Sequence, residues 1–360
     1  MKNKARILNY DLLRIVAMIG VVLIHVNGFY LYSVDVNSKR FIILNAFTSL
    51  VRFSAPAFIM ISGAFFLNPK KELTTKRIYH KYISRVLIAL LATNLIYILY
   101  FYFIVNGYRG FGWIKLFLVR TINGDPSAEQ LWYLYAAIWL YMLTPILRKI
   151  TANSSKKEIE YFLLIGFIFT VFFPTLTTFS SFQNLKFVNF VHSMGVDLKI
   201  NYILYFFAGY YIDTYWNEKM KKYNKYAYVL YVLSILYTIV VGTYISINNR
   251  TATLSNVYYY FSVNVFMSTI AIFIIFKSLK INEDNHKLVS VINYLSSRSF
   301  GVYLIHVLLI SIFYKYVPNI NEVVLVPLFT LFVVFLSLIL TEILGLIPFI
   351  RKKNIYVLKE

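Results

Sequence analysis

Cysteine is absent from the 360 residues of this chain, and charged residues make up only 14% of it. The first absence excludes a thiol nucleophile, a disulfide and a thiolate metal site. The second, together with a hydrophobic content of 59%, excludes a soluble globular or disordered chain, because roughly a quarter of an ordinary soluble domain is charged. Apolar runs of membrane-spanning length instead predict an integral membrane protein.

Acidic residues are also scarce. The chain has 15 Asp and Glu against 36 Lys and Arg, which gives a formal net charge of +21. In a membrane protein such an excess reports first on topology, and then on attraction for anionic lipid or an anionic cofactor. We therefore expect membrane lipids among the partners of this protein, and no nucleic acid.

Ten apolar segments are predicted to cross the membrane as helices of about 20 residues. They are 9–29, 41–67, 82–105, 131–147, 160–175, 201–216, 226–247, 257–277, 299–317 and 323–348, with the fifth and sixth among the shortest. No small-residue cleavage site follows the first segment, so we expect it to remain in the mature chain. The prediction is an all-α integral membrane bundle that forms one domain over residues 1–360.

The basic residues support ten crossings. If the N-terminus is cytoplasmic, inner segments hold 24 of the 36 lysines and arginines and outer segments hold nine. The remaining three, Arg14, Arg52 and Arg85, fall within spans. Because cytoplasmic loops carry the excess of basic residues, we expect both termini and the loop at 68–81 to be cytoplasmic.

The first span carries two ionisable residues, whose burial in hydrocarbon costs free energy and therefore indicates a partner or a function. Arg14 and His25 are eleven residues apart, so they lie on one helix face about 16 Å apart along the axis. A neutral imidazole can take a proton from a hydroxyl, whereas an arginine can only bind anions or orient dipoles. The alternative is a packing arginine and a satisfied histidine. Asp11, one turn before Arg14, is expected to pair with it.

Two further arginines are candidates for binding an anion. Arg85 follows a cytoplasmic loop with five basic residues, a density that suits a partner with several phosphates, although topology and lipid headgroups would explain the loop equally well. Arg52 is expected near mid-membrane and facing the bundle interior. In the same span, Pro56 frees a backbone carbonyl, and Ser62-Gly63 allows a close helix approach or a local break.

Four more side chains complete the candidate set. Tyr303 and His306 lie about one turn apart in the ninth span, where a lone histidine is more often structural than catalytic. Trp132 and Tyr133 are expected to begin the fourth span at the outer surface, where they would stack on a sugar or anchor the interface. Glu342, in the last span, is expected to pair with an arginine or a histidine.

Taken together, these segments resemble the membrane acyltransferase-3 family, the O-acyltransferases of cell-surface glycans. Four motifs in the family's order carry the resemblance over about residues 6–348. They are Arg14 and His25 with ten residues between them, Pro56-Ala-Phe-Ile-Met-Ile-Ser62-Gly63, Leu131-Trp132-Tyr133-Leu134, and Ser299-Phe-Gly-Val-Tyr303-Leu-Ile-His306. Two positions depart from the family's pattern: Tyr82 stands where a second arginine is frequent, and Val307 where a proline is.

The resemblance implies an acyltransferase of the stand-alone type, without an extracytoplasmic hydrolase-like domain, in the plasma membrane of a bacterium. It would move an acyl group, expected to be acetyl, from cytoplasmic acyl-CoA to a hydroxyl of a surface polysaccharide or lipid-linked glycan. His25 would be the general base or a transient acyl carrier, and Arg14 would orient the reacting groups. Arg85, Arg52 and Ser62 would bind acetyl-CoA, and Trp132, Tyr133, Tyr303 and His306 the acceptor. No metal is expected.

Two other functions remain open. A transporter or flippase of a lipid-linked glycan would also need intramembrane charges and a polar path, but not the ten-residue spacing between arginine and histidine. A sensory or scaffolding module would act with another protein. Transport driven by ATP, zinc proteolysis and lipase-type chemistry have no support, because G-x-x-x-x-G-K-[ST], HExxH and G-x-S-x-G are all absent from the sequence.

Overall fold

The computed structural model describes residues 7–124, 127–176, 201–316 and 321–346. Every regular element within these ranges is helical, and no strand occurs there. The all-α prediction is therefore confirmed. The two termini, predicted to be cytoplasmic, lie outside the described residues.

Nine helical segments in the described ranges are long and apolar enough to cross a membrane. They are Leu8–Leu31, Lys39–Phe66, Thr75–Val105, Glu129–Asn153, Lys156–Leu176, Glu218–Asn248, Ser255–Ser278, His286–Phe313 and Glu322–Gly345. Each matches one of the predicted spans. The remaining predicted span, 201–216, corresponds to α12 (Asn201–Tyr215), whose 15 residues are fewer than the about 20 that a crossing helix needs.

The regular helices that build these segments have the following bounds: α1 (Leu8–Leu31), α2 (Lys39–Val51), α3 (Ser54–Phe66), α4 (Thr75–Arg77), α5 (Ser84–Leu99), α7 (Trp132–Asn153), α8 (Lys156–Phe167), α9 (Phe173–Leu176), α13 (Asn224–Asn248), α14 (Ser255–Tyr258), α15 (Val263–Ser278), α16 (His286–Phe313) and α17 (Glu322–Gly345). Helix α6 (Gly112–Ile122) lies between two of the spanning segments. Wider π-helical turns flank α5 at Ile78–Ile83 and Tyr100–Val105, and another at Ile168–Phe172 joins α8 to α9.

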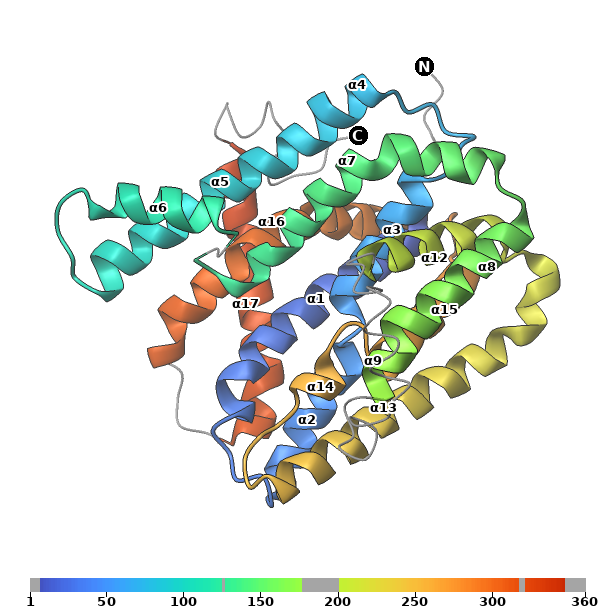
Figure 1. Ribbon diagram of the computed structural model, residues 1–360. Helices are drawn as coiled ribbons and strands as arrows, with labels where there is room; N and C mark the ends of the chain where they lie inside the picture. Colours follow the sequence, from blue (N-terminus) through green and yellow to red (C-terminus); the bar gives the residue numbers. More distant parts are fainter. Residues whose placement is uncertain (1–6, 125–126, 177–200, 317–320, 347–360) are drawn as a thin grey trace.

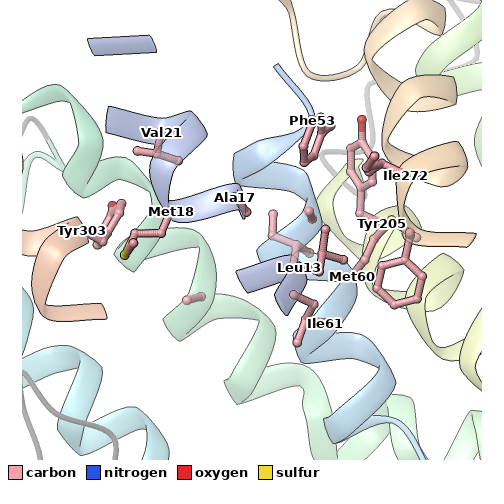
Figure 2. Packing of buried hydrophobic residues seen from close by; sticks show 14 of the residues in the cluster. Leu13, Ala17, Met18, Val21, Phe53, Met60, Ile61, Tyr205, Ile272 and Tyr303 are labelled. Carbon is pink, nitrogen blue, oxygen red and sulfur yellow. The ribbon is translucent and has the colours of Figure 1, made fainter. Parts of the chain in front are cut away.

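Helix α1 is the centre of the bundle (Figure 1), in contact with α2, α3, α15, α16 and α17. Its neighbours pack with it in one apolar cluster, to which α1 contributes Leu13 and Met18, α3 Met60, α12 Tyr205 and α16 Tyr303 (Figure 2). Helices α8 and α13 are the least buried of the spanning helices. They expose apolar side chains such as Leu164 and Leu236, as helices that face lipid do.

The second span is interrupted at Arg52 and Phe53, which separate α2 from α3. Pro56 explains the break, because it lacks the N–H that would bond to the Arg52 carbonyl four residues earlier, and its ring crowds that carbonyl. Ser62-Gly63 instead lies within unbroken α3. A Cβ at Gly63 would overlap the Phe206 backbone of α12, and one at Gly209 of α12 would overlap Met60. The predicted close approach at Gly63 is thus confirmed, and the break lies at Arg52.

The segment before α7 is partly buried in the bundle although it is polar and non-helical at its start. Ala128, Gln130 and Leu131 are almost inaccessible, whereas Glu129 is exposed. Asn94 of α5 accepts a hydrogen bond from the Ser127 N–H at 3.0 Å, and the Gln130 amide donates to the Tyr97 hydroxyl at 2.9 Å. Irregular backbone at membrane depth is tolerated where protein groups satisfy it, so these bonds allow α7 to begin inside the bundle.

Candidate active site

Five helices, α1, α3, α5, α7 and α16, surround a cavity of about 110 Å³. Arg14, Ser62, Arg85, Tyr133 and Tyr303 line it, together with the aromatic rings of Phe58, Tyr141 and Phe300 and the hydroxyl-bearing Ser299. Five of the predicted site residues therefore meet in one place. The cavity is a candidate binding site for an anionic acyl donor, because it combines two cationic groups with hydroxyls and apolar walls.

Among the described residues, Asp11 is the ion-pair partner of Arg14. Its Nη1 lies 2.9 Å from Oδ1 of Asp11, which confirms the predicted pairing. Asp11 is buried, and the Ser296 hydroxyl of α16 donates to the same oxygen at 2.5 Å. The carboxylate thus ties Arg14 to α16 while the guanidinium still borders the cavity. This arrangement fixes the position of a cation without removing it from the cavity.

Arg85 has no such carboxylate partner within the part of the chain that the structure describes. It is the second residue of α5, directly after the π-helical turn Ile78–Ile83, and its guanidinium lies over the Phe300 ring at 5.6 Å. Its Nε is buried without a hydrogen-bond partner among the described residues. An unpaired buried guanidinium nitrogen is costly, and its cost falls when an anion fills the cavity.

Arg52 lies apart from this cavity. Its Nε donates to the Tyr258 carbonyl at 2.6 Å, and its guanidinium lies over the rings of Tyr258 at 5.3 Å and Tyr260 at 4.5 Å. These contacts join the break between α2 and α3 to α14. Arg52 is also close enough to His25 for an electrostatic interaction. The structure therefore does not bring Arg52 together with Arg85, as a shared donor site would require.

Trp132 and Tyr133, at the start of α7, are partly buried against aromatic side chains from other parts of the chain. Trp132 stacks on Tyr202 with ring centres 5.4 Å apart and lies 5.3 Å from Tyr260. Tyr133 contacts Tyr303, near the middle of α16, with ring centres 5.6 Å apart. Both rings therefore have protein neighbours at the start of α7, and their role toward the acceptor stays a prediction.

His25 meets the other deep histidine of the described chain. Its ring centre lies 5.1 Å from that of His306, with the rings tilted by 56°. His306 is fully buried, whereas His25 is partly exposed. The ring of Tyr303 lies 6.1 Å from that of His306 and also lines the cavity. Tyr303 therefore connects the arginine cavity with the pair of histidines.

Sequence reasoning missed Tyr97, Gln130, Tyr141 and Phe300. Tyr141 and Phe300 line the cavity, and Tyr97 and Gln130 form the hydrogen bonds that hold segment 127–131. Gln130 lies at the end of a polar stretch that hydropathy places outside the membrane. No apolar periodicity therefore identified it as part of the site. Outside the site, Glu342 accepts a bond from Arg298, which confirms the prediction that it pairs with an arginine.

The fold and the site together define a multi-pass membrane protein with a cationic interior cavity and a buried histidine pair. Residues 7–342 match the acyltransferase domain of the acyltransferase-3 family. Because the match spans nearly the whole chain, the protein belongs to this family and is a membrane acyltransferase by descent. No curated protein and no solved structure matches the chain.

Proposed function

We propose that the protein moves an acyl group, acetyl in the first instance, from cytoplasmic acyl-CoA to a hydroxyl of a cell-envelope glycan or lipid-linked sugar. The observation that carries this proposal is the cavity in which Arg14 and Arg85 border the same space. The histidine that can accept a proton follows on the same face of α1. Family membership supplies the reaction class, and this geometry supports the choice of an anionic donor.

Acyl-CoA would bind at the end of the site that Arg85 lines. Five basic residues, Lys70, Lys71, Lys76, Arg77 and Lys81, precede it in the chain, and α4 with its π-helical turn joins them directly to α5. Arginine forks and lysine charges suit the phosphates of CoA. Arg85 and Ser62 would hold the donor, and Arg14 would bind it at the cavity end of α1, about 16 Å along the axis from His25, so the thioester would extend past Tyr303 toward the histidine.

The acceptor end is the side of His25. The sugar hydroxyl gives its proton to the His25 ring, its oxygen bonds to the acyl carbon, the carbon–sulfur bond breaks, and the proton passes to the departing thiolate. If His25 instead carries the acyl group transiently, the same bonds form in two steps. Tyr133, Tyr303 and the stacked Trp132 offer aromatic faces and a hydroxyl that suit a sugar.

Thiol release from acyl-CoA tests the proposal against a transporter or flippase. The purified protein in lipid discs would receive labelled acetyl-CoA and an envelope extract as acceptor source, and free CoA would be measured with a thiol reagent. The cysteine-free chain contributes no background. We expect thiol release together with label in the glycan fraction, both lost in the His25→Ala variant. If neither thiol release nor labelled glycan is found with acetyl-CoA or with longer acyl-CoAs, the result would favour transport without acyl transfer.

The orientation of the site has its own test. A single cysteine at Thr74, in the basic loop before α4, should not react with an impermeant thiol reagent added to intact cells. It should react once the membrane is opened. Labelling from outside would place the Arg85 side of the cavity away from cytoplasmic acyl-CoA and would contradict the donor assignment. A cysteine at Asn249, in the turn after α13, is the matched control expected to react from outside.

A further inference from the structure

The tautomer of His306 is fixed by its own helix. Its Nδ1 lies 2.8 Å from the Tyr303 carbonyl and 3.2 Å from the Val302 carbonyl. Carbonyl oxygens only accept hydrogen bonds, so Nδ1 must carry the proton. In the neutral ring the other nitrogen, Nε2, then holds a lone pair and can only accept.

This lone pair has no protein partner in the described ranges, although it is fully buried. A buried acceptor left unpaired costs about 1–3 kcal/mol, so a neighbouring donor is expected. His25 is the nearest candidate on the facing helix, with the ring centres 5.1 Å apart. The His306 ring is held by its bonds to the helix carbonyls, so a rotation of the His25 ring is the movement that would bring a His25 nitrogen toward Nε2. Arg52, the charged neighbour of His25, donates its Nε–H to the Tyr258 carbonyl.

A frame of hydrogen bonds holds His306 in this position. The Tyr97 hydroxyl of α5 bonds to the backbone of α16, where it accepts from the Leu308 N–H at 2.8 Å and donates to the Leu304 carbonyl at 3.3 Å. These two groups lie one helical turn apart, on either side of His306. Gln130 donates to the same hydroxyl, and the Tyr303 hydroxyl donates to the Gln130 carbonyl.

We propose that His306 is the positioning residue of His25: its Nε2 accepts an N–H from His25 and so leaves the other His25 nitrogen unprotonated and directed at the acceptor hydroxyl. This inference rests on the proposed role of His25 as base. When His25 takes the hydroxyl proton, its bond to Nε2 becomes charge-assisted and therefore stronger. The arrangement is like that of a catalytic triad, in which a hydrogen bond to a further residue orients the base. Here the residue that orients the base is a second imidazole.

Nitrogen-15 spectroscopy tests the tautomers without any substrate. Histidine-labelled protein in lipid discs should show His306 protonated at Nδ1 at neutral pH. In the His306→Leu variant the His25 signals should change tautomer or become a mixture. The exposed His286, on the first turn of the same helix, supplies the control variant His286→Gln, in which the His25 signals should stay unchanged. Unchanged His25 signals in His306→Leu would overturn the proposal.

Kinetics with acetyl-CoA and an envelope extract separate positioning from packing. The His306→Gln side chain keeps an acceptor near the position of Nε2, whereas His306→Leu keeps volume and loses the acceptor. We expect His306→Leu to lower kcat by roughly 10–100-fold with little change in the KM for acetyl-CoA, and His306→Gln to recover much of this loss. Equal losses in the two variants, or a loss confined to KM, would overturn the proposal.

The two tests also separate this inference from the proposed function. If the wild-type protein releases no thiol from acyl-CoA, the acyl-transfer proposal fails, while the spectra still report whether His306 orients His25. If transfer is observed but the His25 tautomer is independent of His306, the function stands and the positioning role is wrong. A variant that does not fold is recognised because it elutes as aggregate. In that case the wild-type spectrum still tests the proposal, because a His306 ring that is not protonated at Nδ1 would contradict it.

Discussion

The two ends of α1 offer different chemistry to the same reaction path. Around Arg14 the site is cationic and hollow, with two guanidinium groups and one buried carboxylate at or beside the cavity. Around His25 it is closely packed, and an imidazole and hydroxyl-bearing tyrosines replace the arginines. One end can bind an anion and the other can accept a proton. The difference indicates that donor binding and proton transfer are separate tasks, so variants at the two ends should change different kinetic constants.

The largest effect is expected at the histidine end. General acid–base catalysis typically contributes 10²–10⁴-fold, so His25→Ala should lower kcat by about that factor. The fold should persist, because one partly exposed side chain among many helices contributes little to it. Thiol release at saturating acetyl-CoA measures kcat, and elution as a single species checks folding. Activity within a few-fold of wild type would reject His25 as base and as acyl carrier.

The next effect is expected at the arginine end, and it should appear in donor affinity. A hydrogen bond to a charged group is worth about 1.5–3 kcal/mol, so Arg85→Ala should weaken acyl-CoA binding by roughly 10–100-fold. Arg85→Lys should lose less, since it keeps the charge without the fork. Calorimetric titration with CoA measures both. Unchanged affinity in a folded Arg85→Ala protein would assign Arg85 to packing against Phe300.

A smaller effect is expected from the frame that surrounds the histidine pair. In Tyr97→Phe the hydroxyl that bonds to the backbone of α16 is lost, and the Gln130 amide loses its partner. We expect kcat to fall by several-fold and CoA affinity to stay unchanged, because the frame touches His306 and not the arginines. Steady-state kinetics with varied donor separates the two constants. A change in donor affinity alone would break the proposed division between the two ends.

Residue spacing along single helices was enough to predict much of this arrangement. The apolar runs predicted ten crossing segments, nine of which match long apolar helices in the described ranges, and spacing within one helix predicted the pairing of Arg14 with Asp11. Contacts between helices were not predictable in the same way. Spacing along a helix says which residues share a face, but not which other helix that face meets. The contact of His25 with His306 depends on how α1 and α16 pack, and a lone sequence carries no such information.

Burial at the end of a loop was the other limit. Hydropathy assigned residues up to 130 to an outer loop and began the fourth span at 131. Within that loop Ala128 and Gln130 are buried, because Asn94, Tyr97 and Tyr303 bond to polar groups of the stretch, and those partners lie far away in the sequence. Arg52 was placed correctly within its span. Its neighbours, however, were not predictable, because they belong to the irregular chain around α14.

The last comparison concerns Arg52, and it tests whether this residue belongs to the arginine cavity. We expect its substitution to have little effect on donor affinity. The Arg52→Lys variant keeps a positive charge but loses the Nε–H that bonds to the Tyr258 carbonyl and the flat group that covers two tyrosine rings.

Loss of these contacts should lower the free energy of unfolding by about 1–2 kcal/mol. CoA affinity should stay within about twofold of wild type, since Arg52 does not line the arginine cavity. Thermal unfolding in detergent and titration with CoA measure the two quantities on the same preparation, with Arg85→Lys as the matched control. A tenfold loss of CoA affinity with unchanged stability would contradict this assignment and return Arg52 to the donor site.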